Sequence, residues 1–347
     1  MAESRILARV RGGVGHLTLD RPEALNALDL GMIRDLTKAL QSWQSDPEVR
    51  AVLLDGAGER GLCAGGDVRT LYDQIVAGRP EETGVFFREE YALNALIAQY
   101  PKPVVAIADG ITMGGGIGLA GHASIRVVTE RSRLAMPETR IGFAPDVGGT
   151  WLLGHAPGRL GEHLGLTGTT MDAADAVYAG FADHVVPSAS LPALATALEA
   201  GGDPVEIVRS FAVEPGPSSL EASRAWIDDA FAGDGVAEVV ARLRGRQEPE
   251  AQATADTLET LSPTGLAVTL AAVRRARELP DLRAALAQEY AVVMWFATSQ
   301  PDLVEGIRAQ LVDKDRSPRW DPPTIAELDP ATGAAALAHQ PPVPLWD

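Results

Sequence analysis

Apolar residues in the first part of the chain occur in short runs that are typical of strands. Residues 5–19 predict two strands around a turn at Gly12-Gly13, because apolar and polar positions alternate in the second strand. Continuous apolar runs at residues 51–54 and 103–108 predict two further strands, buried on both faces. Strands of this kind usually pair in parallel and are joined by helices.

Helical spacing of apolar residues appears between these strands and then dominates the second half. Residues 26–44 carry Leu28, Met32, Leu36, Leu40 and Trp43 at that spacing. After about Pro187 the predicted helices cover residues 191–200, 219–231, 235–244, 266–278 and 282–296. The stretch 322–347 is rich in proline and alanine and predicts irregular structure. The sequence therefore predicts an α/β core over residues 1–200 and a helical C-terminal region over residues 201–347, packed on that core.

Charge and hydropathy narrow the class of protein. The 347 residues are 46% hydrophobic and carry a formal net charge of −17. So acidic a protein is a poor binder of nucleic acid, whose phosphates it would repel. No apolar run approaches the roughly 18 residues that a membrane span needs. We expect a globular enzyme with neither a nucleic-acid nor a membrane role.

Two further absences concern compartment and metal chemistry. No charged-then-apolar targeting pattern precedes the first predicted strand, which predicts a cytoplasmic protein. Cys63 is the single cysteine, so neither an internal disulfide nor a cysteine-rich metal site can form. Its apolar neighbours predict a packed side chain rather than a nucleophile.

Two glycine-bearing segments follow predicted strands and could carry chemistry. The first is Cys63-Ala64-Gly65-Gly66-Asp67, and the second contains Gly114-Gly115-Gly116 at the start of a predicted helix. Backbone N–H groups at such positions favour negative charge, and one from each loop could form an oxyanion hole. Alternatively, the glycines only permit tight turns or close packing. Neither segment matches the phosphate-loop or dinucleotide patterns.

A third segment carries two carboxylates. Glu138 and, eight positions later, Asp146 lie in a stretch interrupted by glycine and proline, among apolar neighbours. A carboxylate held against apolar surface is more basic than usual, which suits a nucleophile or a general base. Taken alone, Glu138 could instead cap a helix, and Asp146 could form a turn.

Together these segments resemble the crotonase superfamily. The similarity begins at residues 19–28 and continues through Ala64–Asp67, Gly114–Gly116 and Met136–Glu138. The resemblance implies a spiral of ββα units with a helical C-terminal region, and acyl-CoA thioesters as substrates. It also implies that the thioester oxygen binds the amides of Gly66 and Gly115, with Ala64, Asp67 and Gly114 beside the substrate.

Within the superfamily, the chain departs from the hydratases and resembles the hydrolases that cleave 3-hydroxyisobutyryl-CoA in valine degradation. Hydratases carry a glutamate shortly after the glycine triplet, where this chain has Gly118, which cannot activate water. The segment 143–149 with Asp146, the segment 86–91 with Glu90, and the C-terminal segments 261–264 and 312–320 match the hydrolases.

This resemblance implies a hydrolytic mechanism. Glu138 would be the nucleophile or the general base. Asp146 would orient the substrate's 3-hydroxyl or the hydrolytic water, and Glu90 would bind the same hydroxyl region. The chemistry requires no metal or redox cofactor, and coenzyme A enters only as part of the substrate.

Two alternatives stay open at this point. One is an enoyl-CoA hydratase or isomerase of the same fold that obtains its second acid from elsewhere. The other is a non-catalytic protein that binds CoA esters. The resemblance also leaves a homo-oligomer open, because crotonase relatives often assemble through their C-terminal helices.

Overall fold

The computed structural model describes residues 4–346, which form two compact units. The first unit contains the chain up to Gly66, Glu89–Ala135 and Thr170–Glu221. The second contains Asp67–Arg88, Met136–Thr169 and the chain from Ala222 onward. The predicted division of the sequence at residue 200 stays a prediction. Residues 136–169 belong to the same compact unit as the C-terminal helices.

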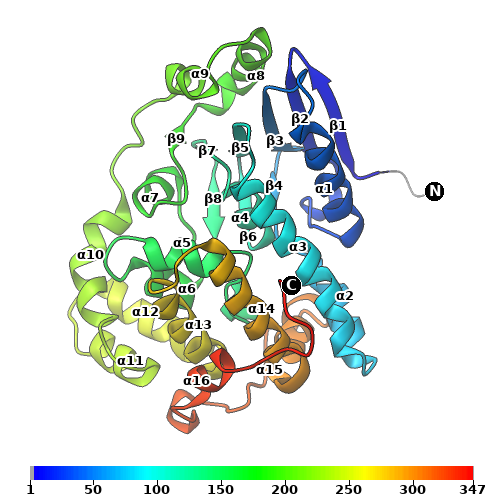
Figure 1. Ribbon diagram of the computed structural model, residues 1–347. Helices are drawn as coiled ribbons and strands as arrows, with labels where there is room; N and C mark the ends of the chain where they lie inside the picture. Colours follow the sequence, from blue (N-terminus) through cyan, green and yellow to red (C-terminus); the bar gives the residue numbers. More distant parts are fainter. Residues whose placement is uncertain (1–3, 347) are drawn as a thin grey trace. The chain divides into compact units, whose positions relative to one another are not determined.

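The first unit is built on two sheets, which are visible in Figure 1. In the larger sheet the strand order is β1-β2-β3-β5-β7-β9; β1 and β2 pair antiparallel, and all other neighbours pair in parallel. The smaller sheet is parallel, with the order β4-β6-β8. The strands are β1 Ile6–Arg11, β2 Val14–Leu19, β3 Ala51–Gly56, β4 Gly61–Cys63, β5 Val104–Ala108, β6 Ile111–Met113, β7 Ile125–Val128, β8 Arg133–Ala135 and β9 His184–Val185.

Successive strands alternate between the two sheets, so the chain advances as a spiral. Each of the pairs β3/β4, β5/β6 and β7/β8 places one strand in the larger sheet and the next in the smaller sheet. The predicted spiral of ββα units is therefore confirmed. The helices of this unit are α1 Leu30–Gln44, α4 Gly115–Ala120, α7 Ala173–Tyr178, α8 Leu191–Ala200 and α9 Pro204–Phe211; α3 Thr83–Ala98 and α10 Ser219–Ala230 run from one unit into the other.

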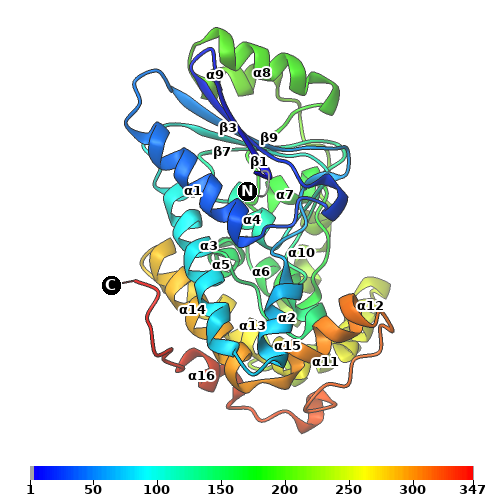
Figure 2. The ribbon, with the colours of Figure 1, turned by 90° about the vertical axis from the view of Figure 1, so that its right-hand side faces the viewer.

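Helices cover both faces of the larger sheet, which explains its continuous apolar strands. Leu194 and Leu198 of α8 lie in one buried cluster with Leu53 and Val105 of the sheet. On the opposite face, the ring of Trp43 in α1 packs so closely over Gly15 that a Cβ there would collide with it. Figure 2 shows α8 and α9 on one side of the sheet and α1 on the other. Strands buried on both faces read as uninterrupted apolar runs.

The second unit consists of helices around α13 (Figure 1). Ten of the fourteen residues of α13 are buried, and α5, α6, α14 and α16 contact it. Its helices are α2 Val68–Val76, α5 Gly149–His155, α6 Leu160–Thr167, α11 Val236–Arg244, α12 Pro249–Thr260, α13 Pro263–Ala276, α14 Leu282–Ser299, α15 Pro301–Ile307 and α16 Thr332–Leu337. None of the helices within residues 4–346 has the length and apolar character needed to cross a bilayer.

Two predicted elements need correction. The helix expected from residue 26 begins at Leu30, because the Asp29 side chain caps it by accepting a hydrogen bond from the Met32 amide at 2.9 Å. The stretch 322–347 is not wholly irregular, since α16 lies within it. Gly333 of this helix sits so close to Ala271 of α13 that a Cβ there would approach the alanine methyl to 2.8 Å.

Candidate active site

Backbone hydrogen bonds fix the loop that carries Gly66 in the first unit. The Leu28 amide donates to the carbonyl of Gly65 at 2.9 Å, and the Ala64 amide donates to the carbonyl of Leu25 at 3.0 Å. The segment before α1 is thereby tied to the loop after β4. Cys63 at the end of β4 is fully buried, and burial raises the pKa of its thiol to about 12, so it is a packed side chain.

Each residue of the glycine triplet has its own structural reason to be glycine. Gly114 has φ +49° and ψ −119°, a conformation that side chains rarely adopt. A Cβ on Gly116 would lie 2.5 Å from the carbonyl oxygen of Cys63, because α4 packs directly against the end of β4. Gly115 is the first residue of α4, and a Cβ on it would lie 3.2 Å from the amide nitrogen of Gly66. The triplet thus brings two loops into contact.

The amides of Gly66 and Gly115 are both available to an added acceptor. Among the hydrogen bonds of residues 4–346 that lie outside regular helices and strands, neither amide is a donor. The Gly115 amide also lies at the N-terminal end of α4, where the first N–H groups have no partner within the helix. Two neighbouring amides without acceptors can receive one developing oxyanion.

Glu90 lies beside this pair of amides. It belongs to α3, its side chain is 2% exposed, and its Oε1 would be only 2.6 Å from a Cβ on Gly115. The structure therefore brings together Gly66, Gly115 and Glu90, with Ala64 and Gly114 in the same two loops. Asp67 follows directly as the N-terminal cap of α2, in the second unit.

Glu138 opens a short 3-10 helix, Glu138–Ile141, in the second unit. It is buried, and its Oε2 has no hydrogen-bond partner among the described residues. Burial raises the pKa of Glu138 well above the usual range for a glutamate, and the charges of Asp146 and Glu289 raise it further. Glu138 makes no ion pair within the part of the chain that the structure describes. A basic carboxylate with an oxygen that no hydrogen bond occupies can act as a nucleophile or a general base.

Asp146 is also buried, and it precedes the turn that leads into α5. In this turn the Gly149 amide donates to the carbonyl of Asp146 at 2.6 Å. A third buried carboxylate, Glu289, reaches the turn from α14 and accepts hydrogen bonds from Gly148 and Thr150. The sequence analysis missed Glu289, which lies 143 residues after Asp146 and belongs to an unremarkable helical pattern.

The two C-terminal segments that resemble the hydrolases support the residues around Glu138. Gly142 approaches the backbone of Asp302 in α15 and the ring of Trp320 so closely that a Cβ there could not fit. Asp302 in turn accepts hydrogen bonds from the Ser262 hydroxyl at 2.5 Å and from the Asp321 amide at 2.8 Å. The segments 261–264 and 312–320 therefore pack, directly or through Asp302, against the end of the 3-10 helix that carries Glu138.

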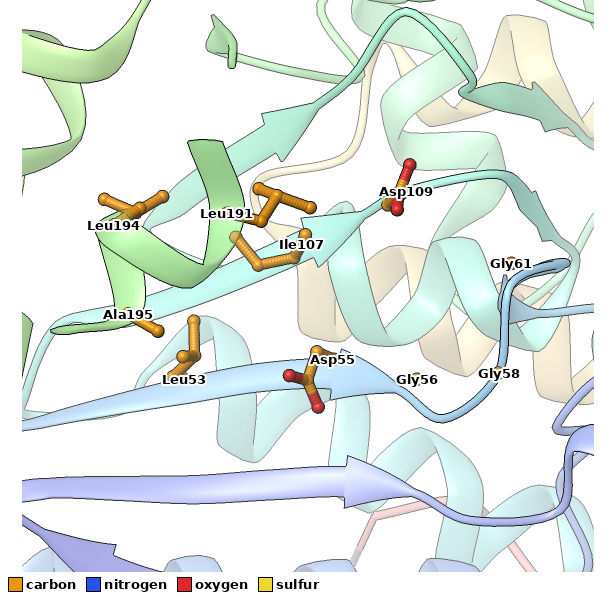
Figure 3. Close-up of a pocket in the computed structure, with 10 residues that line it drawn as sticks. All are labelled: Leu53, Asp55, Gly56, Gly58, Gly61, Ile107, Asp109, Leu191, Leu194 and Ala195. Carbon is orange, nitrogen blue, oxygen red and sulfur yellow. The ribbon is translucent and has the colours of Figure 1, made fainter. Parts of the chain in front are cut away.

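A separate cavity of about 120 Å³ lies in the first unit between the larger sheet and α8 (Figure 3). Asp55 and Asp109 face it from the ends of the neighbouring strands β3 and β5. Drug-sized ligands need about 300–1,000 Å³, so this cavity is too small for a CoA ester. None of the predicted site residues lines it. Within residues 4–346, no three His, Cys, Asp or Glu side chains are grouped so that they could hold a metal ion.

Comparison with known proteins decides the family. The family model for enoyl-CoA hydratase/isomerase matches residues 14–337. The chain belongs to this family. It is 39% identical over 327 residues to the mitochondrial 3-hydroxyisobutyryl-CoA hydrolase of Xenopus laevis, covering 91% of this chain and 84% of that protein. The human mitochondrial 3-hydroxyisobutyryl-CoA hydrolase is 36% identical over 345 residues, covering 94% and 86%. The predicted resemblance to these hydrolases is confirmed, and this chain is an enzyme that resembles them.

Solved structures confirm the crotonase fold. A carnitinyl-CoA dehydratase from Mycobacterium thermoresistibile superposes with a TM-score of 0.94 at 48% identity, covering 98% of both chains. An enoyl-CoA hydratase from Rhodobacter sphaeroides gives a TM-score of 0.92 at 42% identity, covering 99% of both chains. These two proteins are named for dehydration and hydration, whereas the relatives above are named for hydrolysis.

Proposed function

We propose that this enzyme cleaves 3-hydroxyisobutyryl-CoA to 3-hydroxyisobutyrate and coenzyme A, a step of valine degradation. The observation that carries the proposal is the carboxylate of Glu138, which is buried, made basic by its surroundings and without a hydrogen-bond partner at Oε2 among the described residues. A hydratase needs a second acid/base group, and its position is occupied by Gly118 inside α4. The choice of 3-hydroxyisobutyryl as the acyl group is taken from the relatives that align over nine-tenths of the chain.

In the proposed reaction, the thioester oxygen accepts hydrogen bonds from the amides of Gly66 and Gly115 as negative charge develops on it. Glu138 follows one of two routes. It attacks the carbonyl carbon, expels the CoA thiolate and forms a mixed anhydride that water then hydrolyses. Alternatively, it removes a proton from water, whose oxygen attacks the carbonyl carbon, and the C–S bond breaks as the intermediate collapses. In both routes the thiolate leaves and takes up a proton, and no metal or redox cofactor takes part.

Asp146 and Glu90 are proposed to recognise the substrate's 3-hydroxyl or to orient the hydrolytic water. Each is a buried carboxylate, and carboxylates accept hydrogen bonds from hydroxyl groups. Sites that hydrogen-bond a substrate hydroxyl discriminate strongly against analogues that lack it, because the buried polar group then loses its partner. Isobutyryl-CoA, which lacks only this hydroxyl, should therefore be a much poorer substrate.

The test is a thiol-release assay with 3-hydroxyisobutyryl-CoA and isobutyryl-CoA, run beside hydration of crotonyl-CoA followed by loss of its conjugated absorbance. We expect rapid thiol release from the hydroxylated ester and no hydration. Hydration of crotonyl-CoA without thiol release from either ester would replace the proposal with a hydratase. That second candidate is kept because of the two solved structures described as dehydratase and hydratase.

A further inference from the structure

Glu289 is a buried carboxylate to which the proposed mechanism gives no task. Its side chain comes from α14 and is 1% exposed. Oε2 accepts a hydrogen bond from the Gly148 amide at 2.6 Å, and Oε1 accepts bonds from the amide and the hydroxyl of Thr150 at 2.8 and 2.5 Å. Glu289 thus uses both carboxylate oxygens on the turn that follows Asp146.

This turn has a backbone conformation that needs outside support. Val147 has φ +54° and Gly148 has φ +78°, so two consecutive residues are left-handed. Such a conformation is costly for a β-branched residue and persists only where the surrounding structure enforces it. The bonds from Gly148 and Thr150 to Glu289 supply that enforcement directly after Asp146.

The hydrogen-bond pattern calls for a carboxylate rather than an amide. One oxygen faces the Gly148 amide and the other faces the Thr150 amide, so both must be acceptors. A glutamine has one acceptor oxygen and one NH₂ group, which would point a donor at a backbone donor. Burying a glutamate is costly, and its charge also acts on Glu138. A protein is expected to bear the free-energy cost of a buried carboxylate where that carboxylate holds the geometry next to a reacting group.

We propose that Glu289 is a positioning residue of the hydrolase, which holds the 146–150 turn and thereby the orientation of Asp146 relative to Glu138. This inference rests on the proposed function, because it assigns Asp146 and Glu138 to the reaction. Glu289 itself touches neither substrate nor water in this scheme and acts only through the turn.

The decisive variant is Glu289→Gln, which keeps the size of the side chain. We expect kcat for thiol release to fall about 100-fold, because a small misplacement of catalytic groups has an effect of this size. KM should stay within about threefold of the wild-type value. Hydrogen exchange of the Gly148 and Thr150 amides, measured by mass spectrometry on peptides that cover the turn, should become faster. This second measurement needs no substrate.

Glu162→Gln is the matched control, because Glu162 is equally buried but pairs with Arg159 and Arg277 instead of bonding to the turn. It should lower stability and leave kcat per folded molecule unchanged. Faster exchange in Glu289→Gln with an unchanged kcat would show a purely structural role and overturn the inference. If the wild-type enzyme releases no thiol from any ester, the proposed function fails instead, whatever the exchange data show.

If Glu289→Gln does not fold, Thr150→Val provides the test. It removes one of the three hydrogen bonds and keeps the shape of the side chain. We expect a fall of about tenfold in kcat with little change in KM. A kcat equal to that of the wild-type enzyme would overturn the inference in this case as well.

Discussion

Replacing Gly115 by alanine tests the oxyanion hole with a single added carbon. Gly115 is absent from the residues with positive φ, so alanine can adopt its backbone conformation at the first position of α4. The new Cβ would lie 2.6 Å from Oε1 of Glu90, 3.2 Å from the nitrogen of Gly66 and 3.3 Å from Cδ1 of Leu28. The first distance is too short for a carbon and an oxygen that are not bonded. Either Glu90 or the start of α4 must move.

The size of the effect follows from what one amide donor contributes. A shift at the start of α4 displaces the Gly115 amide from the oxyanion, and loss of one such donor lowers kcat by about 10²–10³, or about 3–4 kcal/mol of barrier. A shift of the Glu90 side chain alone leaves this amide in place and gives a smaller loss. We expect the larger loss in Gly115→Ala when kcat is measured by thiol release, because Glu90 is itself buried on α3 and has little room to move. The melting temperature should fall by only a few degrees, as for about 1 kcal/mol of overpacking.

Gly235→Ala is the control, because a Cβ on Gly235 meets nothing within 4 Å and the residue lies outside the candidate site. It should keep the kcat of the wild-type enzyme. If Gly115→Ala also keeps that value within about twofold, neither the position of the Gly115 amide nor that of Glu90 matters for the reaction, and the reasoning is wrong.

Four further outcomes are expected. Glu138→Gln should lower kcat at least about 10³-fold at an unchanged melting temperature, and hydrolysis at the wild-type rate would remove Glu138 from the mechanism. The kcat/KM of the wild-type enzyme should rise with pH through the raised pKa of Glu138, since the ionised carboxylate is the form that reacts. In Asp146→Asn, a charge that raises this pKa is removed, so the midpoint of the pH profile should move to lower pH. Glu162→Gln should reduce the free energy of unfolding in urea by about 3 kcal/mol, because it leaves the arginine partners of a buried carboxylate, such as Arg277, less well paired. Cys63, buried and with its pKa raised to about 12, should react with a thiol reagent only after unfolding, and rapid labelling of the folded enzyme would contradict its packed position.

Local patterns in the sequence predicted four of the nine described strands, β1, β2, β3 and β5, because these elements follow rules that act over a few residues. The turn at Gly12-Gly13 and the apolar runs of β3 and β5 were recognisable in this way. The segments 63–67 and 114–116 were recognisable as glycine-bearing segments after predicted strands, whereas the choice of Gly66 and Gly115 came from the resemblance to the crotonase superfamily. The helix α1 was placed too early because Leu28 continues its apolar spacing, although it pairs as an isolated bridge with Gly66.

Features that depend on distant contacts could not be predicted. The carboxylate of Glu289 meets its donors only after α14 has folded against the start of α5, and nothing in its own helix indicates these partners. The short helix α16 is stabilised by contact with α13, not by a strong amphipathic pattern of its own. That Oε2 of Glu138 has no hydrogen-bond partner among the described residues likewise depends on which side chains surround it, which no spacing rule describes.

The separation of the two loop amides is set by the backbone ladder between β4 and β6, since each loop continues one of these paired strands. Neighbouring strands lie about 4.8 Å apart, and two amides that share one oxygen at about 2.9 Å must stand less than about 6 Å from each other. Main-chain spacing therefore matches the width that an anionic oxygen requires, without help from any side chain. Side chains around a bound acyl group could therefore be replaced without changing the spacing of these two amides.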